Sequence, residues 1–134
     1  MTHLLDTNIC ICLIKKQPES VVRQMQSKEI EQVGISTITL SELEYGVAKS
    51  QYTERNRVAL LEFLTPFRIL DFDQAAAHEY GHIRTFLEEK GQLIGPMDLL
   101  IAAHAIARNL VLVTNNEREF RRVPALKIEN WAAE

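Results

Sequence analysis

Apolar positions along this sequence fall into short runs that alternate with longer segments, in which apolar residues recur every three or four positions. The short runs predict β-strands, which we place at residues 3–5, 33–36, 68–70, 110–113 and 126–128. The longer segments predict helices, which we place at residues 9–14 with their flanks, 18–27, 38–49, 53 to the stop at Pro66, 74–90 and 97–109, with one helical turn at 117–121. This alternation is typical of a three-layer α/β domain with a parallel sheet.

Polar residues mark the ends of these elements. Thr7 or Asn8 is expected to cap the first helix, and Asp73 the helix over 74–90, which Gly91 ends. Alanines in the last long helix would let it lie close against the sheet. Right-handed crossovers put the carboxyl ends of parallel strands at one edge, where α/β sheets bind ligands. Candidate catalytic residues are therefore expected at that edge.

The length and the net charge of the chain limit the classes of function that it can have. The 134 residues suit one domain, which we expect to span 1–134. A net charge of −3 provides no global basic field, so contact with nucleic acid needs local basic clusters or a bound metal. Neither a membrane span nor a signal peptide is evident. Cys10 and Cys12 point to nearly opposite helix faces, as expected for two unbridged thiols in a reducing cytoplasm.

Four acidic residues are predicted at the same edge of the sheet. Asp6 follows the first strand, Glu42 lies one turn into a helix, Asp98 starts a helix, and Glu119 lies just past the strand over 110–113. Carboxylates packed together repel one another and raise one another's pKa, and a hard divalent cation relieves that repulsion. A metal held in this way activates water and stabilises charge on a phosphoryl oxygen, which suits phosphodiester hydrolysis.

At these residues the chain resembles the PIN-domain ribonucleases, and within them the VapC toxins of bacterial type II toxin–antitoxin pairs. The resemblance runs from Leu4 to Trp131 and rests on five motifs in matching order, which make it specific although each is weak alone. The motifs are Leu5-Asp6-Thr7-Asn8, Ser41-Glu42-Leu43 with Gly46, Ile94-Gly95-Pro96-Met97-Asp98, Ala103-His104-Ala105, and Thr114-Asn115-Asn116 with Glu119-Phe120.

The resemblance implies a PIN-like fold and an endoribonuclease that depends on Mg²⁺ or Mn²⁺. Asp6, Glu42 and Asp98 match the core acids of the family, with Asp6 and Asp98 expected as metal ligands. Many members carry Asp where this chain has Asn116. Either Glu119 takes over that role, or Asn116 orients a water molecule.

The resemblance also implies partners. The substrate would be RNA, and the likeness to enteric-type members makes initiator transfer RNA the expected target. A cognate VapB-like antitoxin that binds operator DNA would wrap the toxin with its C-terminal segment and block the site. The apolar helix from Val58 to Leu64, which one small domain does not fully cover, adds the expectation of a homodimer.

Other polar residues have a functional and a structural interpretation. Lys49 and Arg118 are candidates for contacts to RNA phosphates. Thr114 either holds a phosphate or a metal-bound water, or simply ends its strand. His104 is a candidate general base, although its place in an alanine-rich helix favours a half-buried structural role. Few aromatic residues interleave with the basic ones, so no base-stacking platform is predicted.

Two further functions compete with the nuclease. A phospho-acceptor receiver would use Asp6, but it needs its acceptor at a later strand end and a lysine beyond it, and neither is found in order. A binding module without catalysis has no need to hold mutually repelling carboxylates together. Cleavage of labelled RNA on addition of Mg²⁺ or Mn²⁺ separates all three.

Overall fold

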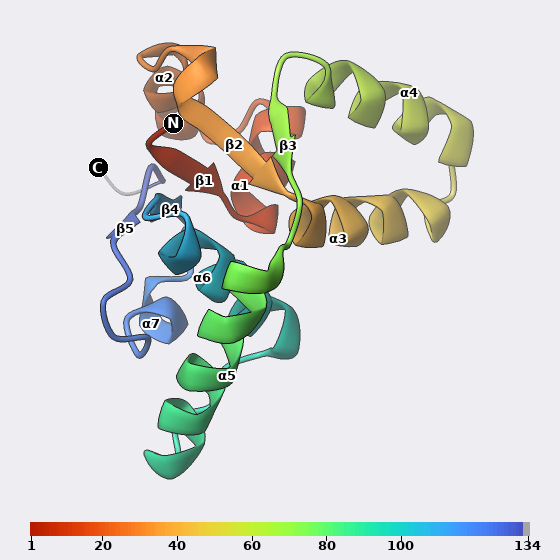
Figure 1. The fold of residues 1–134 in the computed structure, drawn as a ribbon. Helices are drawn as coiled ribbons and strands as arrows, with labels where there is room; N and C mark the ends of the chain where they lie inside the picture. The colour runs from red at the N-terminus through yellow and green to blue at the C-terminus, as the bar shows by residue number, and fades with distance from the viewer. Residues whose placement is uncertain (133–134) are drawn as a thin grey trace.

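A five-stranded parallel sheet forms the middle of the molecule (Figure 1). The computed structural model describes residues 1–132. The strand order is β3-β2-β1-β4-β5, so β1 lies at the centre. The strands are β1 (His3–Leu5), β2 (Val33–Ser36), β3 (Arg68–Leu70), β4 (Val111–Val113) and β5 (Ile128–Glu129). The helices are α1 (Thr7–Lys15), α2 (Glu19–Gln26), α3 (Thr37–Ala48), α4 (Thr53–Leu64), α5 (Gln74–Glu89), α6 (Pro96–Ala107) and α7 (Glu117–Phe120), with a 3-10 turn at Ile30–Gln32.

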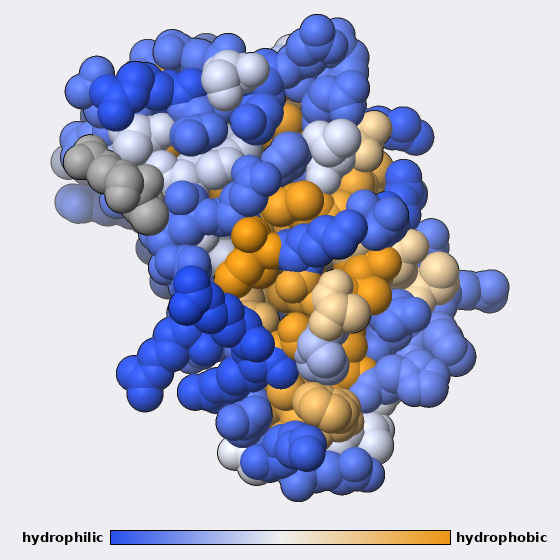
Figure 2. All heavy atoms as spheres, turned by 90° about the vertical axis from the view of Figure 1, so that its left-hand side faces the viewer, coloured by the Kyte–Doolittle hydropathy of each residue, from blue (hydrophilic) through white to orange (hydrophobic). Residues whose placement is uncertain are grey.

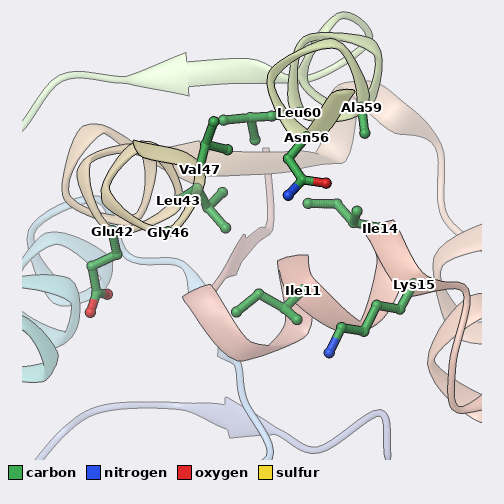
Figure 3. A pocket seen from close by; sticks show the side chains of 10 residues that line it. All are labelled: Ile11, Ile14, Lys15, Glu42, Leu43, Gly46, Val47, Asn56, Ala59 and Leu60. Atoms are coloured by element: carbon green, nitrogen blue, oxygen red, sulfur yellow. The ribbon is translucent and has the colours of Figure 1, made fainter. Parts of the chain in front are cut away.

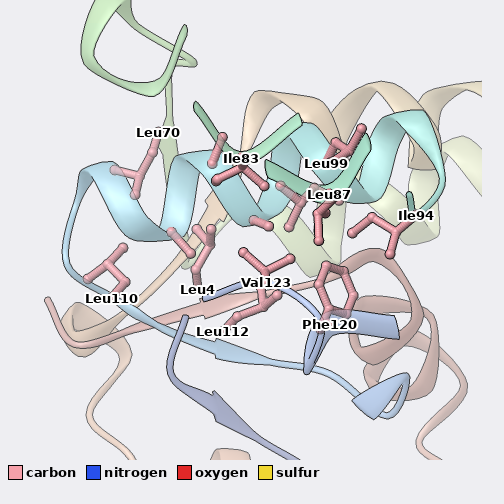
Figure 4. Packing of buried hydrophobic residues seen from close by; sticks show 14 residues of the cluster. Leu4, Leu70, Ile83, Leu87, Ile94, Leu99, Leu110, Leu112, Phe120 and Val123 are labelled. Carbon is pink, nitrogen blue, oxygen red and sulfur yellow. The ribbon is translucent and has the colours of Figure 1, made fainter. Parts of the chain in front are cut away.

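The central strand separates two hydrophobic cores because successive side chains of a strand point to opposite faces. Leu4 packs into the core that α5, α6 and α7 cover, together with Leu112 and Phe120 (Figure 4). Leu5 packs into the other core, which α1, α2, α3 and α4 cover, and Val113 lies beside it. The predicted three-layer α/β fold with a short-stranded parallel sheet is therefore confirmed.

The elements agree closely with the predicted ones, with two corrections. The last strand lies at Ile128–Glu129 rather than at 126–128, because Thr114 donates its backbone N–H to the carbonyl of Glu129 at 2.9 Å. Asp6, and neither Thr7 nor Asn8, caps α1. Gly91 ends α5 as expected. Its φ is +65°, a backbone conformation that residues other than glycine rarely adopt.

Helix α6 is buried on nearly all sides, as its alanines led us to expect. Ala102, Ala103 and Ala105 are fully buried, and the helix packs against both α5 and β4. Figure 2 shows the face at the left of Figure 1, where apolar side chains form a band that runs from the middle of the view down through the lower half, the half that contains α5 and α6. In the described residues, no helix is long and apolar enough to span a membrane.

Candidate active site

The carboxyl ends of three neighbouring strands meet at the edge of the sheet. Leu5 of β1 pairs with Ile35 of β2 on one side and with Val113 of β4 on the other. The next residue along β1 is Asp6, whose backbone N–H donates to the carbonyl of Val113 at 3.0 Å. The sheet register therefore places Asp6 beside Thr114, at the edge where α/β folds bind ligands.

Asp6 is almost completely buried, with 4% of its surface exposed. Its Oδ1 accepts the backbone N–H of Ile9 at 2.9 Å, so the side chain caps α1. A hydrogen bond from the Thr114 hydroxyl reaches the same carboxyl group. Burial raises the pKa of Asp6 to about 6, against the effect of these two hydrogen bonds, and the charge of Glu42 adds to the rise.

Glu42 enters the site from α3 and is held by α1. The Thr7 hydroxyl donates a hydrogen bond to its Oε1. Thr7, expected only as a possible helix cap, therefore has a role that was not predicted. The signal was available in the position of Thr7 directly after Asp6, on the first turn of a helix that starts at the sheet edge. The bond fixes one acid of the site to the helix that the other acid caps.

Asp98 and Glu119 belong to α6 and α7, the helices on the other face of the sheet from α1 and α3. Asp98 lies in the first turn of α6, where the helix dipole favours an anion. Burial raises its pKa to about 6, and the charges of Glu119, Glu42 and Asp6 add to the rise in that order. When protonated, Asp98 also shares a hydrogen bond with Glu119. The four predicted acids therefore lie close enough to repel one another.

The turn that leads into α7 holds Glu119 in place. Asn116 donates from Nδ2 to Oε2 of Glu119 at 3.3 Å. Asn116 also donates its backbone N–H to the Thr114 hydroxyl at 2.9 Å, which links this turn to Asp6. In this arrangement the amide of Asn116 holds the carboxylate of Glu119.

The donor set is chemically suited to a hard divalent cation. All four side chains are carboxylates, and oxygen ligands of this type are what Mg²⁺ and Mn²⁺ prefer. The raised pKa values of Asp6 and Asp98 mark negative charge that a cation would compensate. Within residues 1–132, however, no three His, Cys, Asp or Glu side chains converge as a preformed ligand cage. One oxygen of Asp6 and one of Glu42 bond to Ile9 and Thr7 instead.

Three other candidates lie outside the acidic cluster. Thr114 is fully buried, and its hydroxyl bonds to the carboxyl group of Asp6, so it orients that acid. Lys49 is exposed at the end of α3, with its ammonium 4.7 Å from the centre of the Tyr45 ring. Arg118 is exposed on α7, next to Glu119.

His104 has the structural role that its alanine-rich surroundings favour. It is fully buried, its Nδ1 lies 2.8 Å from the Ser36 hydroxyl, and its ring stacks edge-on against Phe72. Burial lowers its pKa, so the imidazole is neutral at pH 7. Because it cannot reach solvent, it is no candidate for a general base. Both thiols are free, as expected, with Cys10 buried and Cys12 partly buried.

Known proteins show the same fold and share much of the sequence. The family model of the PIN domain matches residues 3–126, and the chain belongs to the PIN-domain family, whose nucleases generally depend on divalent metals. Ribonuclease VapC2 of Rickettsia felis is 48% identical over 132 residues, 98% of each chain. The tRNA(fMet)-specific endonuclease VapC of Shigella flexneri is 46% identical, over 98% of this chain and 99% of that one. Within the family, the chain is therefore a VapC ribonuclease.

Solved structures agree with this placement. The crystal structure of VapBC2 from Rickettsia felis bound to a promoter DNA fragment matches with a TM-score of 0.89 and 46% identity, over 98% of this chain and 99% of that one. DNA-bound VapBC from Salmonella typhimurium matches with a TM-score of 0.92 and 45% identity, over 98% of each chain. The family decides against the phospho-acceptor receiver.

Proposed function

We propose that this chain is the toxin of a type II toxin–antitoxin pair and that it cleaves transfer RNA with the help of Mg²⁺ or Mn²⁺. The observation that carries the proposal is that Asp6, Glu42, Asp98 and Glu119 lie near enough at one sheet edge for their charges to act on one another, with the pKa of Asp6 and of Asp98 raised to about 6, mainly by burial. We take initiator transfer RNA as the substrate, because that is what the Shigella relative is named for. Residues 1–134 act as one PIN-like domain in the cytoplasm.

The four acids have two kinds of role in the proposed reaction. Asp6 and Asp98 hold the metal, since both carry negative charge that lacks a cationic partner. A metal held there would supply a Lewis acid for the scissile phosphate and would favour deprotonation of a water molecule. Glu42, fixed by Thr7, and Glu119, fixed by Asn116, accept hydrogen bonds from water at the rim of the site. Thr114 keeps Asp6 oriented and lowers its pKa, which favours the charged form that binds metal. Asn116 acts through Glu119, and Lys49 and Arg118 bind RNA phosphates.

A groove beside the acids suits the antitoxin. It has a volume of about 340 Å³ and runs between α1, α3 and α4, with Glu42 at one end and Lys15 at the other (Figure 3). Its walls are mainly apolar and include Ile11, Ile14 and Leu43. The C-terminal segment of a VapB-like antitoxin would bury these side chains and extend an arginine toward Glu42, replacing the charge of the metal. The antitoxin would bind operator DNA through its other end.

Exposed apolar side chains support a homodimer. Val58 and Leu61 on α4 each keep 55% of their surface exposed, as expected from the apolar pattern of that helix. The band of apolar side chains in Figure 2 is a second candidate interface. Surfaces of this kind on a small domain mark contacts with other chains. A strict monomer in light scattering at high concentration would contradict the dimer.

Cleavage of defined transfer RNAs tests the proposed function. The purified chain should cut initiator transfer RNA at discrete positions with Mn²⁺ and should leave it intact in EDTA. An elongator transfer RNA should be cut far more slowly. Asp98→Asn should be inactive, whereas Glu62→Gln, which removes an exposed acid of α4, should retain full activity. Cleavage that persists in EDTA, or that Asp98→Asn leaves unchanged, would contradict the proposal.

A further inference from the structure

A second groove lies between the end of α5 and α7, away from the helices α1, α3 and α4 that line the antitoxin groove. It has a volume of about 430 Å³. Phe86 and Lys90 line it from the end of α5, and Arg118, Arg121 and Arg122 line it from α7 and the turn that follows. Four basic side chains therefore gather in one groove of a chain whose net charge is −3. The groove supplies the local basic cluster that contact with nucleic acid requires in an acidic protein.

Most of this positive charge is available to a ligand. Arg121 forms an ion pair with Glu117 at 2.8 Å. Arg122 donates from Nη1 to the backbone carbonyl of Leu93 at 3.3 Å, which holds it in place without neutralising it. Among residues 1–132, no carboxylate lies within 4.0 Å of the charged group of Lys90 or of Arg118. The groove thus has three uncompensated cations.

An aromatic ring lies among these charges. Phe86 keeps 38% of its surface exposed, and the ammonium of Lys90 lies 5.6 Å from the centre of its ring. A basic groove with an exposed aromatic face is the combination by which proteins bind single-stranded nucleic acid, since phosphates follow the cations and a base stacks on the ring. Duplex RNA offers no unstacked base to such a ring.

The segment that lines the groove at α7 also carries one acid of the cluster. Arg118 is the neighbour of Glu119 on α7, and Arg122 follows one turn later, with its backbone N–H bonded to the carbonyl of Glu119 at 3.1 Å. From Arg118 to Arg122 the chain advances by about 6 Å at helical rise. The basic residues of the groove and one acid of the cluster therefore belong to the same short segment, 118–122.

We propose that this groove binds the single-stranded segment of the RNA substrate that flanks the cleaved bond. Lys90, Arg118 and Arg122 bind successive phosphates, and one base stacks on Phe86. The inference rests on the proposed nuclease function and adds a site for substrate binding that lies outside the acidic cluster. Arg118, expected to contact one RNA phosphate, would then act together with the other basic residues of the groove.

Binding without cleavage tests the groove directly. The affinity for a fluorescent single-stranded oligoadenylate is measured by anisotropy in EDTA, between about 50 and 200 mM KCl. Lys90→Gln with Arg118→Gln should weaken binding about tenfold at the lower salt concentration, and should reduce the slope of log Kd against log salt by about 1.4, because each lost phosphate contact contributes about 0.7. The matched control is Arg23→Gln with Arg55→Gln, which removes the same charge from α2 and α4.

The proposed stacking of a base on Phe86 is tested by a substitution that changes no charge. Phe86→Leu should weaken binding of the single strand about fivefold or more with the salt slope unchanged, and should leave binding of a duplex RNA unaffected. Equal losses in the groove variant and in the Arg23 and Arg55 control would overturn the proposal, since net charge alone would then explain both. Unchanged binding by the groove variant would overturn it as well.

The proposed function has a separate readout. Cleavage of transfer RNA by the wild-type chain with Mn²⁺ shows whether the chain is a nuclease, whatever the groove does. If the wild type cleaves and the Lys90 and Arg118 variant binds and cleaves equally well, the groove assignment is wrong and the nuclease stands. If the wild type binds single-stranded RNA through the groove and does not cleave, the nuclease assignment is wrong and the groove stands.

Discussion

Replacing Asp6 by asparagine should stabilise the metal-free protein while abolishing its activity. The carboxyl group is 4% exposed, and its pKa is raised to about 6, mainly by burial. Asparagine has nearly the same shape and caps helices as well as aspartate does, so the bond from the backbone N–H of Ile9 is kept. The Thr114 hydroxyl can rotate to accept from the new amide. Only the charge is lost.

The size of the effect follows from the pKa shift. A rise from 3.8 to about 6 corresponds to about 3 kcal/mol, because one pKa unit is worth 1.36 kcal/mol. Since the folded-state pKa lies above the unfolded value, the cost is present above pH 6 and disappears as the pH falls toward about 4. The buried amide has its own desolvation cost, so we expect a net gain of about 2 kcal/mol at pH 7. For a chain of this size that is a rise in Tm of roughly 5–10 °C.

Thermal unfolding with and without metal provides the assay. In EDTA at pH 7, Asp6→Asn should melt above the wild type, and the difference should vanish near pH 4. Added Mn²⁺ should stabilise the wild type, by about 2.7 kcal/mol when the metal is at 100 times Kd, and should leave the variant unchanged. Glu62→Gln removes an exposed acid of α4 and should change stability by less than about 0.5 kcal/mol.

One result would refute the reasoning. If Asp6→Asn melts below the wild type in EDTA at pH 7 and still gains as much stability from Mn²⁺, the charge of Asp6 is not destabilising. Asp6 would then be a helix cap alone, and the metal would bind elsewhere. A circular dichroism spectrum equal to that of the wild type ensures that the comparison concerns the same fold.

Three further outcomes are expected. Asp98→Asn should reduce RNA cleavage in Mn²⁺ by more than ~100-fold, because even residues that only support a metal ligand contribute about 10–100-fold; activity within tenfold of the wild type would exclude it as a ligand. Thr114→Val should raise the pKa of Asp6 further, since the hydroxyl lowers it, and should shift the pH of half-maximal cleavage upward with a loss of about 10–100-fold. Gly46→Leu should weaken antitoxin binding in calorimetry by about tenfold, because a Cβ at Gly46 meets no atom within 4 Å and extends into the antitoxin groove; unchanged affinity would place the antitoxin elsewhere.

Local patterns were sufficient to predict the elements of this protein. Short apolar runs gave the strands because both faces of a central parallel strand are buried, as they are for Leu4 and Leu5. Cap residues gave the helix ends, as at Asp73, which accepts the backbone N–H of Ala76 at 3.0 Å. These signals are local because they depend on a residue and its neighbours within one or two turns.

The sequence also indicated the acids of the site, because parallel strands with helical crossovers must end at one edge. It could not indicate which partners hold them. Thr7 lies 35 positions from Glu42, and their bond depends on how α1 packs against α3. The same holds for Thr114 and Asp6, which the pairing of β1 with β4 brings together.

Only the tertiary structure placed Phe86 beside the basic residues. In the sequence it stands 32 positions before Arg118, and few aromatic residues interleave with the charges, so a stacking platform was not predicted. The packing of α5 against α6 and the return of the chain through α7 bring the ring and the cations into one groove. The sequence by itself therefore determined the elements and the carboxylates at the sheet edge. The partners that orient those carboxylates and the surface around them were decided by packing between distant segments, which no local pattern encodes.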